Sequence, residues 1–325
     1  MSKRLLITGA NGFVGSNLVE RATEKGYDVF AAVRKNSDLS ALKNTKATLV
    51  YPDYFNQEKL VQLLSDTGIT HIAHVAGITK ARTENDYYKI NARLSLDLAN
   101  AALLANKELK KFVFVSSLAA MGPTFNKNVI TEETHPHPIT YYGQSKLAGE
   151  EELSKIESLP LISLRPTAVY GPREKDLLML IKMIKKGWEL YIGKAPQELS
   201  FIHVYDLCDA ILLSLESSKN HEAYILSDGI NYNRYAFADI VKETLNTKTI
   251  KLHIPAGLVK TAVTGMEKMF PHRNSILNKN KLLELTSGWG VSLKKAENEL
   301  DYYPKFDLKK GLKQTIEWLK TERWI

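Results

Sequence analysis

A tyrosine, a lysine and a serine are spaced along this chain as an acid/base site would require. Tyr142 and Lys146 are four residues apart, so on a helix they share one face. An unperturbed tyrosine has a pKa of about 10, and a nearby ammonium group favours its phenolate form. Ser117 ends an expected strand 25 residues earlier and could hydrogen-bond the same substrate oxygen. Together the three side chains could interconvert an alcohol and a carbonyl, with Tyr142 moving the proton.

A glycine-rich turn near the start of the chain has the residues that a dinucleotide site needs. Gly9, Gly12 and Gly15 follow the apolar run 5–7 and precede an expected helix. Glycines permit a tight turn, a close approach to a pyrophosphate and close packing of helix on strand. The helix N-terminus would offer unpaired N–H groups and a positive dipole end to the phosphates. A turn of this kind without a ligand is the alternative, because such turns recur in many α/β folds.

The end of the second expected strand favours NADP over NAD as the cofactor. Val33 stands where an acid would accept hydrogen bonds from the adenosine ribose, and Arg34, Lys35 and Ser37 follow it. An arginine offers paired donors to a phosphate dianion, whereas an acid would repel it. The alternative is that Arg34 and Lys35 only solvate a strand end. Further cofactor contacts are predicted at the ends of the next strands, at Asp53, Tyr54, Val75, Ala76 and Gly77.

These side chains depend on a regular alternation of strands and helices. Strands are expected at residues 3–8, 28–33, 47–51, 70–75, 111–116 and 160–165, and helices or turns at 13–25, 38–44, 57–66, 85–105 and 140–157. Strands of buried type that alternate with helices predict an α/β fold with a doubly wound parallel sheet, a Rossmann fold. The alternation fails after residue 165, so a smaller C-terminal lobe is expected. The predicted domains are 1–165 for the dinucleotide and mainly 166–325 for the substrate, with 198–230 returning to the sheet.

The composition argues against several classes of protein. The chain has 325 residues, a net charge of +8 and one cysteine, Cys208, which excludes an internal disulfide framework and suits a reducing cytoplasm. No apolar run is long enough to span a membrane, and no signal-peptide core precedes the first expected strand. The lysine clusters at 107–111 and 182–186 lack interleaved aromatic residues, which favours solvated helix faces over nucleic-acid contacts. His135 and His137 predict an extended loop, with no partner at metal-ligand spacing.

The set of motifs resembles the extended short-chain dehydrogenase/reductase family, that is, the NAD(P)-dependent epimerase/dehydratase superfamily. The resemblance rests on TGANGFVG, HVAG, VSSLAAMG, the Tyr142 to Lys146 spacing, RPTAVYGPR and FIHVYDL, and it runs almost end to end. It implies that Ser117, Tyr142 and Lys146 are the catalytic triad, that Lys146 also holds the nicotinamide ribose, and that Asn91 supports the active site and cofactor. It also implies a homodimer through the helices that contain Asn91 and Tyr142. The further cofactor-binding residues are Asn11, Phe13, Val14, Val115, Ser116, Arg165, Pro166, Thr167 and Val169.

Departures from the family pattern distinguish its branches. Leu118 and Ala119 replace the acidic pair of the sugar-nucleotide dehydratases, so elimination would lack its acid, and Leu199 stands near where many nucleotide-sugar epimerases carry an arginine. Met121 replaces a usual tyrosine and makes one wall of the pocket more apolar. The pattern is therefore more similar to the dihydroflavonol reductase and 3β-hydroxysteroid dehydrogenase branch. The predicted substrate contacts are Thr79, Leu118, Met121, Tyr170, Met179 and Ile202.

The sequence therefore predicts an NADP(H)-dependent oxidoreductase that interconverts an alcohol and a carbonyl on a fairly apolar small molecule. A nucleotide-sugar 4-epimerase is an alternative, because it would use the same triad and return the hydride to the opposite face. A non-catalytic dinucleotide-sensing module is a third possibility, although it would not need the serine, tyrosine and lysine together. His203 and Asp206 are interpreted as an interior pair that holds the late part of the sheet.

Overall fold

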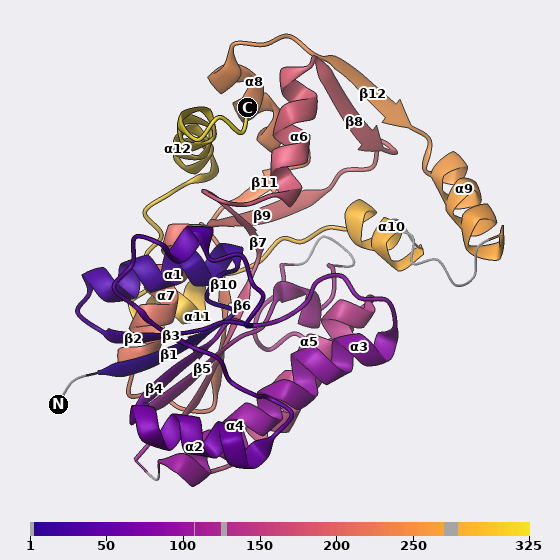
Figure 1. The fold of residues 1–325 in the computed structure, drawn as a ribbon. Helices are drawn as coiled ribbons and strands as arrows, with labels where there is room; N and C mark the ends of the chain where they lie inside the picture. Colours follow the sequence, from indigo (N-terminus) through magenta and orange to yellow (C-terminus); the bar gives the residue numbers. More distant parts are fainter. Residues whose placement is uncertain (1–2, 107, 125–128, 270–278) are drawn as a thin grey trace.

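The chain folds around a seven-stranded parallel sheet. Figure 1 shows the computed structural model, which describes residues 3–106, 108–124, 129–269 and 279–325. The strand order is β10-β6-β5-β4-β1-β2-β3, and every neighbouring pair is parallel. The strands are β1 (Arg4–Thr8), β2 (Asp28–Ala32), β3 (Thr48–Val50), β4 (His71–His74), β5 (Lys111–Val115), β6 (Leu161–Pro166) and β10 (Glu222–Leu226). The predicted doubly wound α/β fold is confirmed.

Helices cover both faces of this sheet, as a buried parallel sheet requires. Every residue of β5 is buried, and so is every residue of β1 after the first. One face carries α1 (Phe13–Glu24) and α7 (Val204–Glu216), and the other carries α2 (Gln57–Thr67), α4 (Leu94–Ala105) and α5 (Tyr141–Ser154) (Figure 1). The strand order reverses between β1 and β4. The carboxyl ends of these two strands therefore open the crevice in which such folds bind ligands.

The helix expected at 85–105 contains a π-helical turn at Asn91. α3 (Glu84–Tyr88) continues into this turn, η2 (Lys89–Arg93), and then into α4. A π turn inserts one residue into a helix and frequently lies at a functional site. Here it places the buried Asn91 side chain against the loop that follows β4, where Asn91 Oδ1 accepts a hydrogen bond from Ile78 N.

A second lobe is built from short elements after residue 166. It holds a three-stranded sheet, β11-β9-β7, and a two-stranded sheet, β12-β8. The strands are β7 (Ala168–Tyr170), β8 (Trp188–Ile192), β9 (Glu198–His203), β11 (Asn231–Asn233) and β12 (Ile250–Ile254). Its helices are α6 (Asp176–Lys185), α8 (Ala236–Leu245), α9 (Ala256–Met269), α10 (Lys279–Thr286) and α12 (Leu308–Thr321). α11 (Lys294–Leu300) packs on the central sheet beside β10. A core from α6, α8, α12 and β9 holds the lobe together.

The segment 198–230 is divided between the two sheets. β10 pairs with β6 in the central sheet, and α7 covers that sheet. β9 does not return to the central sheet, because it pairs with β7 and β11. β7 starts only two residues after β6 ends, so the chain bends out of the central sheet there and β9 follows it. The division into two domains at residue 165 stays a prediction.

Three smaller expectations can be compared directly with the structure. The segment expected as helix or turn at 38–44 holds one 3-10 turn, η1 (Ser40–Leu42). Lys111 does not lie on a solvated helix face: it is buried in β5, and its Nζ donates to Lys219 O at 2.7 Å and Asn220 Oδ1 at 2.6 Å. Lys107 of that cluster lies outside the described residues. Cys208 is buried in α7, and burial raises the pKa of its thiol.

In the part of the chain that is described, no helix has the length and apolar character to cross a membrane.

Candidate active site

The glycine turn joins β1 to α1 with its backbone close to the neighbouring strand. Gly12 N donates to Gly9 O at 2.9 Å, and Gly9 has a φ of +65°. A Cβ on Gly9 would lie 3.0 Å from the backbone of Ala76, and one on Gly15 would clash with the Gly9 carbonyl. Gly12 at the N-cap of α1 provides no capping side chain, so the first N–H groups of the helix are open to a ligand. A bound pyrophosphate would use each of these features.

A cleft of about 1010 Å³ runs from this turn along the carboxyl ends of the strands. Ser116 Oγ and Thr167 Oγ1 in the cleft are buried and have no hydrogen-bond partner among the described residues. Buried polar atoms are normally paired, so these two fit the polar groups of a bound dinucleotide. The sequence-predicted residues that line the cleft are Asn11, Gly12, Phe13, Val14, Val75, Gly77, Thr79, Val115, Ser116, Ser117, Tyr142, Lys146, Pro166, Thr167 and Val169.

Asn91 supports the cleft from behind and does not line it. Its Nδ2 donates to Ile78 O and to Ser145 Oγ, each at 3.0 Å, and its Oδ1 accepts from Ile78 N at 2.8 Å. These bonds join the loop after β4 to α5. A Cβ on Gly77 would lie 2.9 Å from Lys146 Nζ and 3.1 Å from Asn91 Oδ1, so a larger residue there would require these two side chains to shift.

The start of α5 is packed unusually closely on the turn that follows Ser117. This turn is η3 (Leu118–Ala120), and Ser117 Oγ accepts from Ala119 N at 3.2 Å. Thr140 caps α5 by accepting from Gly143 N at 3.1 Å. A Cβ on Gly143 would clash with the Ala119 carbonyl. Gly143 therefore lets α5 approach until the hydroxyls of Ser117 and Tyr142 hydrogen-bond to each other.

The protonation states of the triad follow from burial. Burial raises the pKa of the Tyr142 phenol, and the hydrogen bond with Ser117 opposes this only in part. Lys146 is 3% exposed and its Nζ donates to Val115 O at 2.9 Å; burial lowers its pKa to about 8, partly offset by Glu150. The expectation that Lys146 lowers the pKa of Tyr142 is not met here, because burial dominates. Tyr142 is therefore protonated at neutral pH, as a proton donor must be.

A second cavity of about 380 Å³ opens beside the cleft, and the two share Ser117, Tyr142, Pro166 and Thr167. Its walls come mainly from α6, β8, β9 and α8 and are mostly aliphatic and aromatic. Leu118 lines it as predicted. The lining residues that sequence reasoning missed include Tyr191, Phe201, Arg234, Phe237, Leu285 and Trp289. Since these residues lie on separate elements of the second lobe, no local pattern could have grouped them.

Most of the predicted substrate contacts lie elsewhere. Met121 is buried in a core with Ile130 and Ile225, and Tyr170 is buried with its hydroxyl donating to Asp307 O at 3.1 Å. Residues that are neighbours in a strand face opposite sides, so Phe201 lines the apolar cavity while Ile202 enters the core. Consecutive residues of a helix are about 100° apart, so on α6 Leu180 lines the apolar cavity while Met179 is 69% exposed. Thr79 lines the cofactor cleft and not the apolar cavity.

Several predicted cofactor contacts are also engaged away from the cleft. The Arg165 guanidinium forms a buried ion pair with Glu150 at 2.6 Å, beside a separate hollow. Asp53 lies 3.7 Å from Lys59 Nζ, and burial against the α2 side of the core raises the pKa of Tyr54. The remaining predicted residues are not among those that line the cleft: Gly9, Gly15, Arg34, Lys35, Ser37 and Ala76.

Asp38 is a cleft residue that sequence reasoning missed. It lies five residues beyond Val33 and lines the end of the cleft near the glycine turn, together with Ser40, Ala41 and Asn44. Its carboxylate accepts from Ser40 N at 2.9 Å, which lowers the pKa of Asp38, and its carbonyl accepts from Asn11 Nδ2 at 3.3 Å. The signal in the sequence was Asp38 itself. It is an acid five residues beyond Val33, the position where an acid was expected, and the loop after β2 separates the two.

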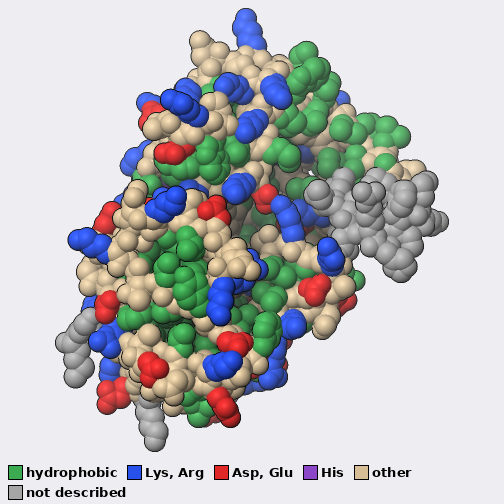
Figure 2. Space-filling view, viewed as in Figure 1, with side chains coloured by type: hydrophobic (Ala, Val, Ile, Leu, Met, Phe, Trp, Pro, Cys, Tyr) green, Lys and Arg blue, Asp and Glu red, His purple; other side chains and the backbone are tan. Residues whose placement is uncertain are grey.

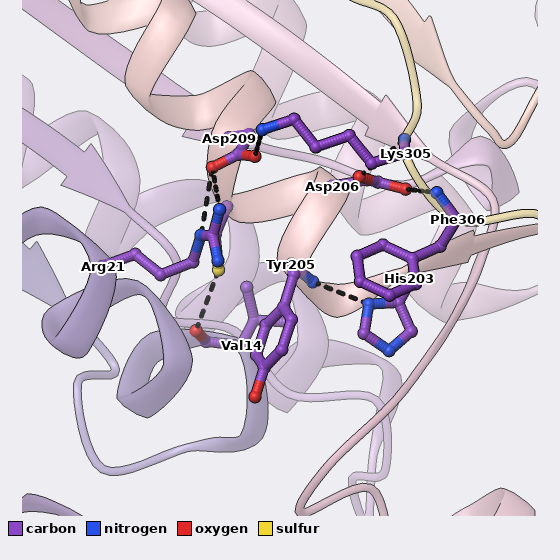
Figure 3. A network of polar contacts seen from close by, with 9 residues as sticks. Val14, Arg21, His203, Tyr205, Asp206, Asp209, Lys305 and Phe306 are labelled. Atoms are coloured by element: carbon purple, nitrogen blue, oxygen red, sulfur yellow. Dashed lines mark hydrogen bonds and ion pairs between the residues drawn. The ribbon is translucent and has the colours of Figure 1, made fainter. Parts of the chain in front are cut away.

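His203 and Asp206 are structural, but they do not form a pair (Figure 3). Asp206 accepts from the N–H groups of Lys305 and Phe306, each at 3.0 Å. His203 Nδ1 accepts from Tyr205 N at 3.3 Å, and its ring stacks on Phe306 with centroids 4.3 Å apart. The predicted interior role is correct, while the partner of each residue is different. Around them, no three His, Cys, Asp or Glu side chains of the described ranges lie together as a metal site would need.

Comparison with known proteins shows to which family this architecture belongs. Residues 5–227 match the model of the NAD dependent epimerase/dehydratase family. Sterol-4-alpha-carboxylate 3-dehydrogenase, decarboxylating, of Dictyostelium discoideum is 25% identical over 95% of this chain and 99% of its own length. UDP-glucose 4-epimerase of Vibrio cholerae is 29% identical over 98% of this chain and 95% of its own length. The crystal structure of UDP-glucose 4-epimerase with UDP-glucose from Thermotoga maritima has a TM-score of 0.81 at 22% identity, covering 98% of this chain and 99% of that one.

Proposed function

The chain belongs to the NAD dependent epimerase/dehydratase family of enzymes, and on this premise we propose that it is an NADP(H)-dependent oxidoreductase of an apolar substrate. The reaction is the interconversion of an alcohol and a carbonyl on a fairly apolar small molecule. The observation that carries the proposal is the apolar cavity of about 380 Å³ that meets the dinucleotide cleft at Ser117 and Tyr142. A substrate held there presents its oxygen to both hydroxyls.

The charges of the apolar cavity support an uncharged substrate over a nucleotide diphosphate. Arg234 is the one cation among the described residues that line it, and its Nη atoms donate to Ala195 O at 2.8 Å and Ile192 O at 2.9 Å. Glu189 and Glu284 add two carboxylates to the same walls. Binding a diphosphate would need several cationic donors, and burying its charge without them would be costly.

The triad residues have distinct roles in this proposal. Ser117 and Tyr142 hold the carbonyl oxygen, and Tyr142 donates its proton to that oxygen during reduction. The dinucleotide, when bound, supplies or accepts the hydride. Lys146 stays charged at neutral pH, because its pKa of about 8 lies above that value, and it would hold a ribose hydroxyl of the dinucleotide. Asn91 keeps the loop after β4 in position behind Lys146.

The preference for NADP is part of the proposal. Arg34 and Lys35 are exposed at the end of β2, and Ser37 Oγ is buried without a partner among the described residues. A 2′-phosphate on the adenosine ribose would satisfy these donors. Asp38 at the same end of the cleft instead suits a ribose hydroxyl. Replacing Arg34 or Asp38 therefore distinguishes binding of NADP from binding of NAD.

The test is a turnover assay with NADPH and with NADH on a panel of apolar ketones that includes 3-ketosteroids. We expect NADPH consumption with at least one apolar ketone and a kcat/KM for NADPH that falls selectively in Arg34→Ala. The Asp38→Ala variant is the matched control and should not lose NADPH use. A parent enzyme that prefers NADH, or that turns over none of the ketones, would contradict the proposal.

A UDP-sugar 4-epimerase is the second candidate, because the Vibrio cholerae relative of that name is 29% identical over nearly the whole chain. An epimerase regenerates its cofactor in each cycle, so it would interconvert UDP-sugars without net consumption of NADH or NADPH. Product analysis after incubation with UDP-glucose distinguishes the two candidates. Formation of an epimer would favour this second function.

The assembly that we propose is a homodimer through α3, η2 and α4 of each copy together with α5. Leu104 on α4 and Tyr141 on α5 are 69% and 44% exposed, and α4 packs beside α5. A dimer would bury both side chains. Sedimentation velocity should give a dimer for the parent chain and a monomer for Leu104→Asp, and a monomeric parent would exclude this assembly.

A further inference from the structure

The small sheet formed by β8 and β12 carries a bare apolar face. The register pairs Trp188 with Ile250, Leu190 with Leu252 and Ile192 with Ile254. Alternate residues of a strand face the same side, so these six side chains share one face. All but Ile192 are among the large hydrophobic residues of the chain that are most exposed, between 39% and 58%. Figure 2 shows hydrophobic side chains gathered over this end of the second lobe.

The opposite face of the same sheet is polar and packed. Glu189 is 2% exposed, bonds Tyr191 Oη at 2.8 Å and pairs with Lys242 of α8 at 2.8 Å. His253 Nδ1 bonds Gly193 O at 2.9 Å. A surface sheet ordinarily buries its apolar face and exposes its polar one. Here the arrangement is inverted, which indicates that the apolar face is built to contact something outside the described chain.

Lysines surround this face and give it a positive rim. Lys182 and Lys186 line a groove with Trp188 at one end of β8, and Lys194 follows the other end. Lys248 precedes β12, and Lys260 lies on α9 half a turn beyond Leu258, which is 66% exposed. These five lysines are exposed, and none forms an ion pair with a carboxylate of the described residues. The face therefore combines apolar area with uncompensated positive charge.

The apolar face is continuous with the mouth of the substrate cavity. Leu190 belongs to both: it lines the cavity and is 45% exposed on the sheet. Leu285 on α10 also lines the cavity and is 48% exposed. An apolar molecule could therefore move from a surface that covers β8 and β12 into the cavity while remaining in contact with hydrocarbon side chains.

We propose that this face docks on an anionic lipid bilayer. The apolar side chains enter the interface between headgroups and acyl chains, a position that also suits Trp188, and the lysines contact anionic headgroups. Docking is peripheral, since no described helix could cross the bilayer. This inference goes beyond the proposed function. Membrane docking is measured as binding to vesicles, in an assay that needs no turnover. Docking can therefore fail while the proposed reaction holds, and the proposed reaction can fail while docking holds.

The test is flotation of the full chain with liposomes of phosphatidylcholine alone and of phosphatidylcholine with 30 mol% phosphatidylglycerol. We expect binding to the anionic vesicles that weakens as salt rises, and weak binding to the neutral ones. Ile250→Ser/Leu252→Ser should abolish it, and Lys182→Glu/Lys186→Glu should weaken it by roughly tenfold or more. The matched controls are Phe55→Ser/Tyr303→Ser, which removes apolar groups of the other part of the chain that are more exposed, at 71% and 65%, and Lys25→Glu/Lys110→Glu. Circular dichroism checks that each variant folds.

Three results would overturn the inference. One is the absence of binding to anionic vesicles, and another is equal loss of binding in the controls. The third is a parent chain that self-associates through this face, seen in sedimentation velocity as a dimer that Ile250→Ser/Leu252→Ser dissociates. That outcome would assign the face to a second copy of the chain.

Discussion

Tyr142 lies where two cavities of different chemistry meet. The phenol borders both the dinucleotide cleft and the apolar cavity, and it is hydrogen-bonded to Ser117. Its pKa is raised by burial, whereas the pKa of Lys146 is lowered to about 8 by the same cause. Desolvation disfavours the charged form of each group, so the two pKa values, nearly equal in water, move apart, and that of Lys146 comes to lie below that of Tyr142. At neutral pH this leaves a neutral proton donor above a charged lysine.

Replacing Tyr142 by Phe should lower kcat by about 10²- to 10⁴-fold, because the proton donor is removed. Cofactor binding should be unchanged, since the ring remains, and a thermal-shift titration with NADPH measures it. Tyr141→Phe is the matched control, because Tyr141 is the exposed neighbour on the same helix. Turnover retained in Tyr142→Phe would remove Tyr142 from the catalytic role.

The pH profile should report Lys146. A lysine is charged below its pKa, so kcat/KM for reduction should be constant near pH 7 and fall as the pH rises through about 8. Tyr142 should add no limb in this range, because its pKa is raised above the ordinary value of 10.0. Arginine keeps its positive charge throughout this range. The Lys146→Arg variant should therefore show no fall in kcat/KM near pH 8, even if its rate is lower overall. The same limb in both proteins would assign it to another group.

Glycines set the distances between the elements that form the site. Gly77, Gly143 and Gly149 each lie where a Cβ would approach another element within 3.0 Å: Lys146 of α5, the turn η3 and the backbone of Asn91, respectively. α5 is therefore held against β5, η2 and η3 at once. Since Ser117 caps η3 and Tyr142 and Lys146 lie on α5, their relative geometry depends on this close packing.

Gly143→Ala should separate α5 from η3 and lower kcat/KM by more than tenfold. We also expect about 1–3 kcal/mol of destabilisation, because the added methyl group meets the backbone of Ala119. Gly257→Ala on α9 is the control, since a Cβ there meets nothing within 4 Å. Urea denaturation and steady-state kinetics measure the two effects. Equal behaviour of both variants would show that close packing of α5 does not position Tyr142.

The whole molecule is joined by the late part of the chain, which returns from the second lobe to the central sheet. Residues 305–306 are held by Asp206 of α7, and Lys305 Nζ pairs with Asp209 at 2.8 Å (Figure 3). Arg21 of α1 donates its Nε to the same Asp209 at 3.0 Å. Asp209 thus joins α1 to the segment at residues 305–306. α12, which follows, then packs in the core of the second lobe.

Asp206→Ala should destabilise the protein by about 3 kcal/mol, because two backbone N–H groups lose their acceptor in a buried place. Thermal unfolding should show a lower Tm, with the position of the triad unaffected. Asp28→Ala removes an exposed ion pair with Arg4 at 3.6 Å and should change stability by less than about 1 kcal/mol. A Tm unchanged in Asp206→Ala would mean that this connection does not hold the two parts together.

Local patterns predicted the fold and the line of the cleft. The βα alternation predicted the parallel sheet, and part of the glycine turn and several strand-end residues line the cleft because parallel strands place their carboxyl ends at one edge. That they bind a dinucleotide stays a prediction. The apolar cavity could not be predicted in the same way. Met121, Tyr170, Met179 and Ile202 fit the expected composition of its wall, but each side chain faces a core or the solvent. A shift of one residue reverses the face that a side chain meets in a strand and turns it by about 100° in a helix.

The sequence by itself determined the family, the sheet and the three residues that could carry acid/base chemistry, because these depend on spacing within one or two adjacent elements. Only the tertiary structure decided the protonation states of those residues and the apolar cavity that lies beside them. Burial sets the pKa values of Tyr142 and Lys146, and it arises from segments far apart in the chain. The pairing of β8 with β12 likewise brings six apolar side chains to one face. Long-range packing, which the order of residues does not display, created both the apolar cavity and that face.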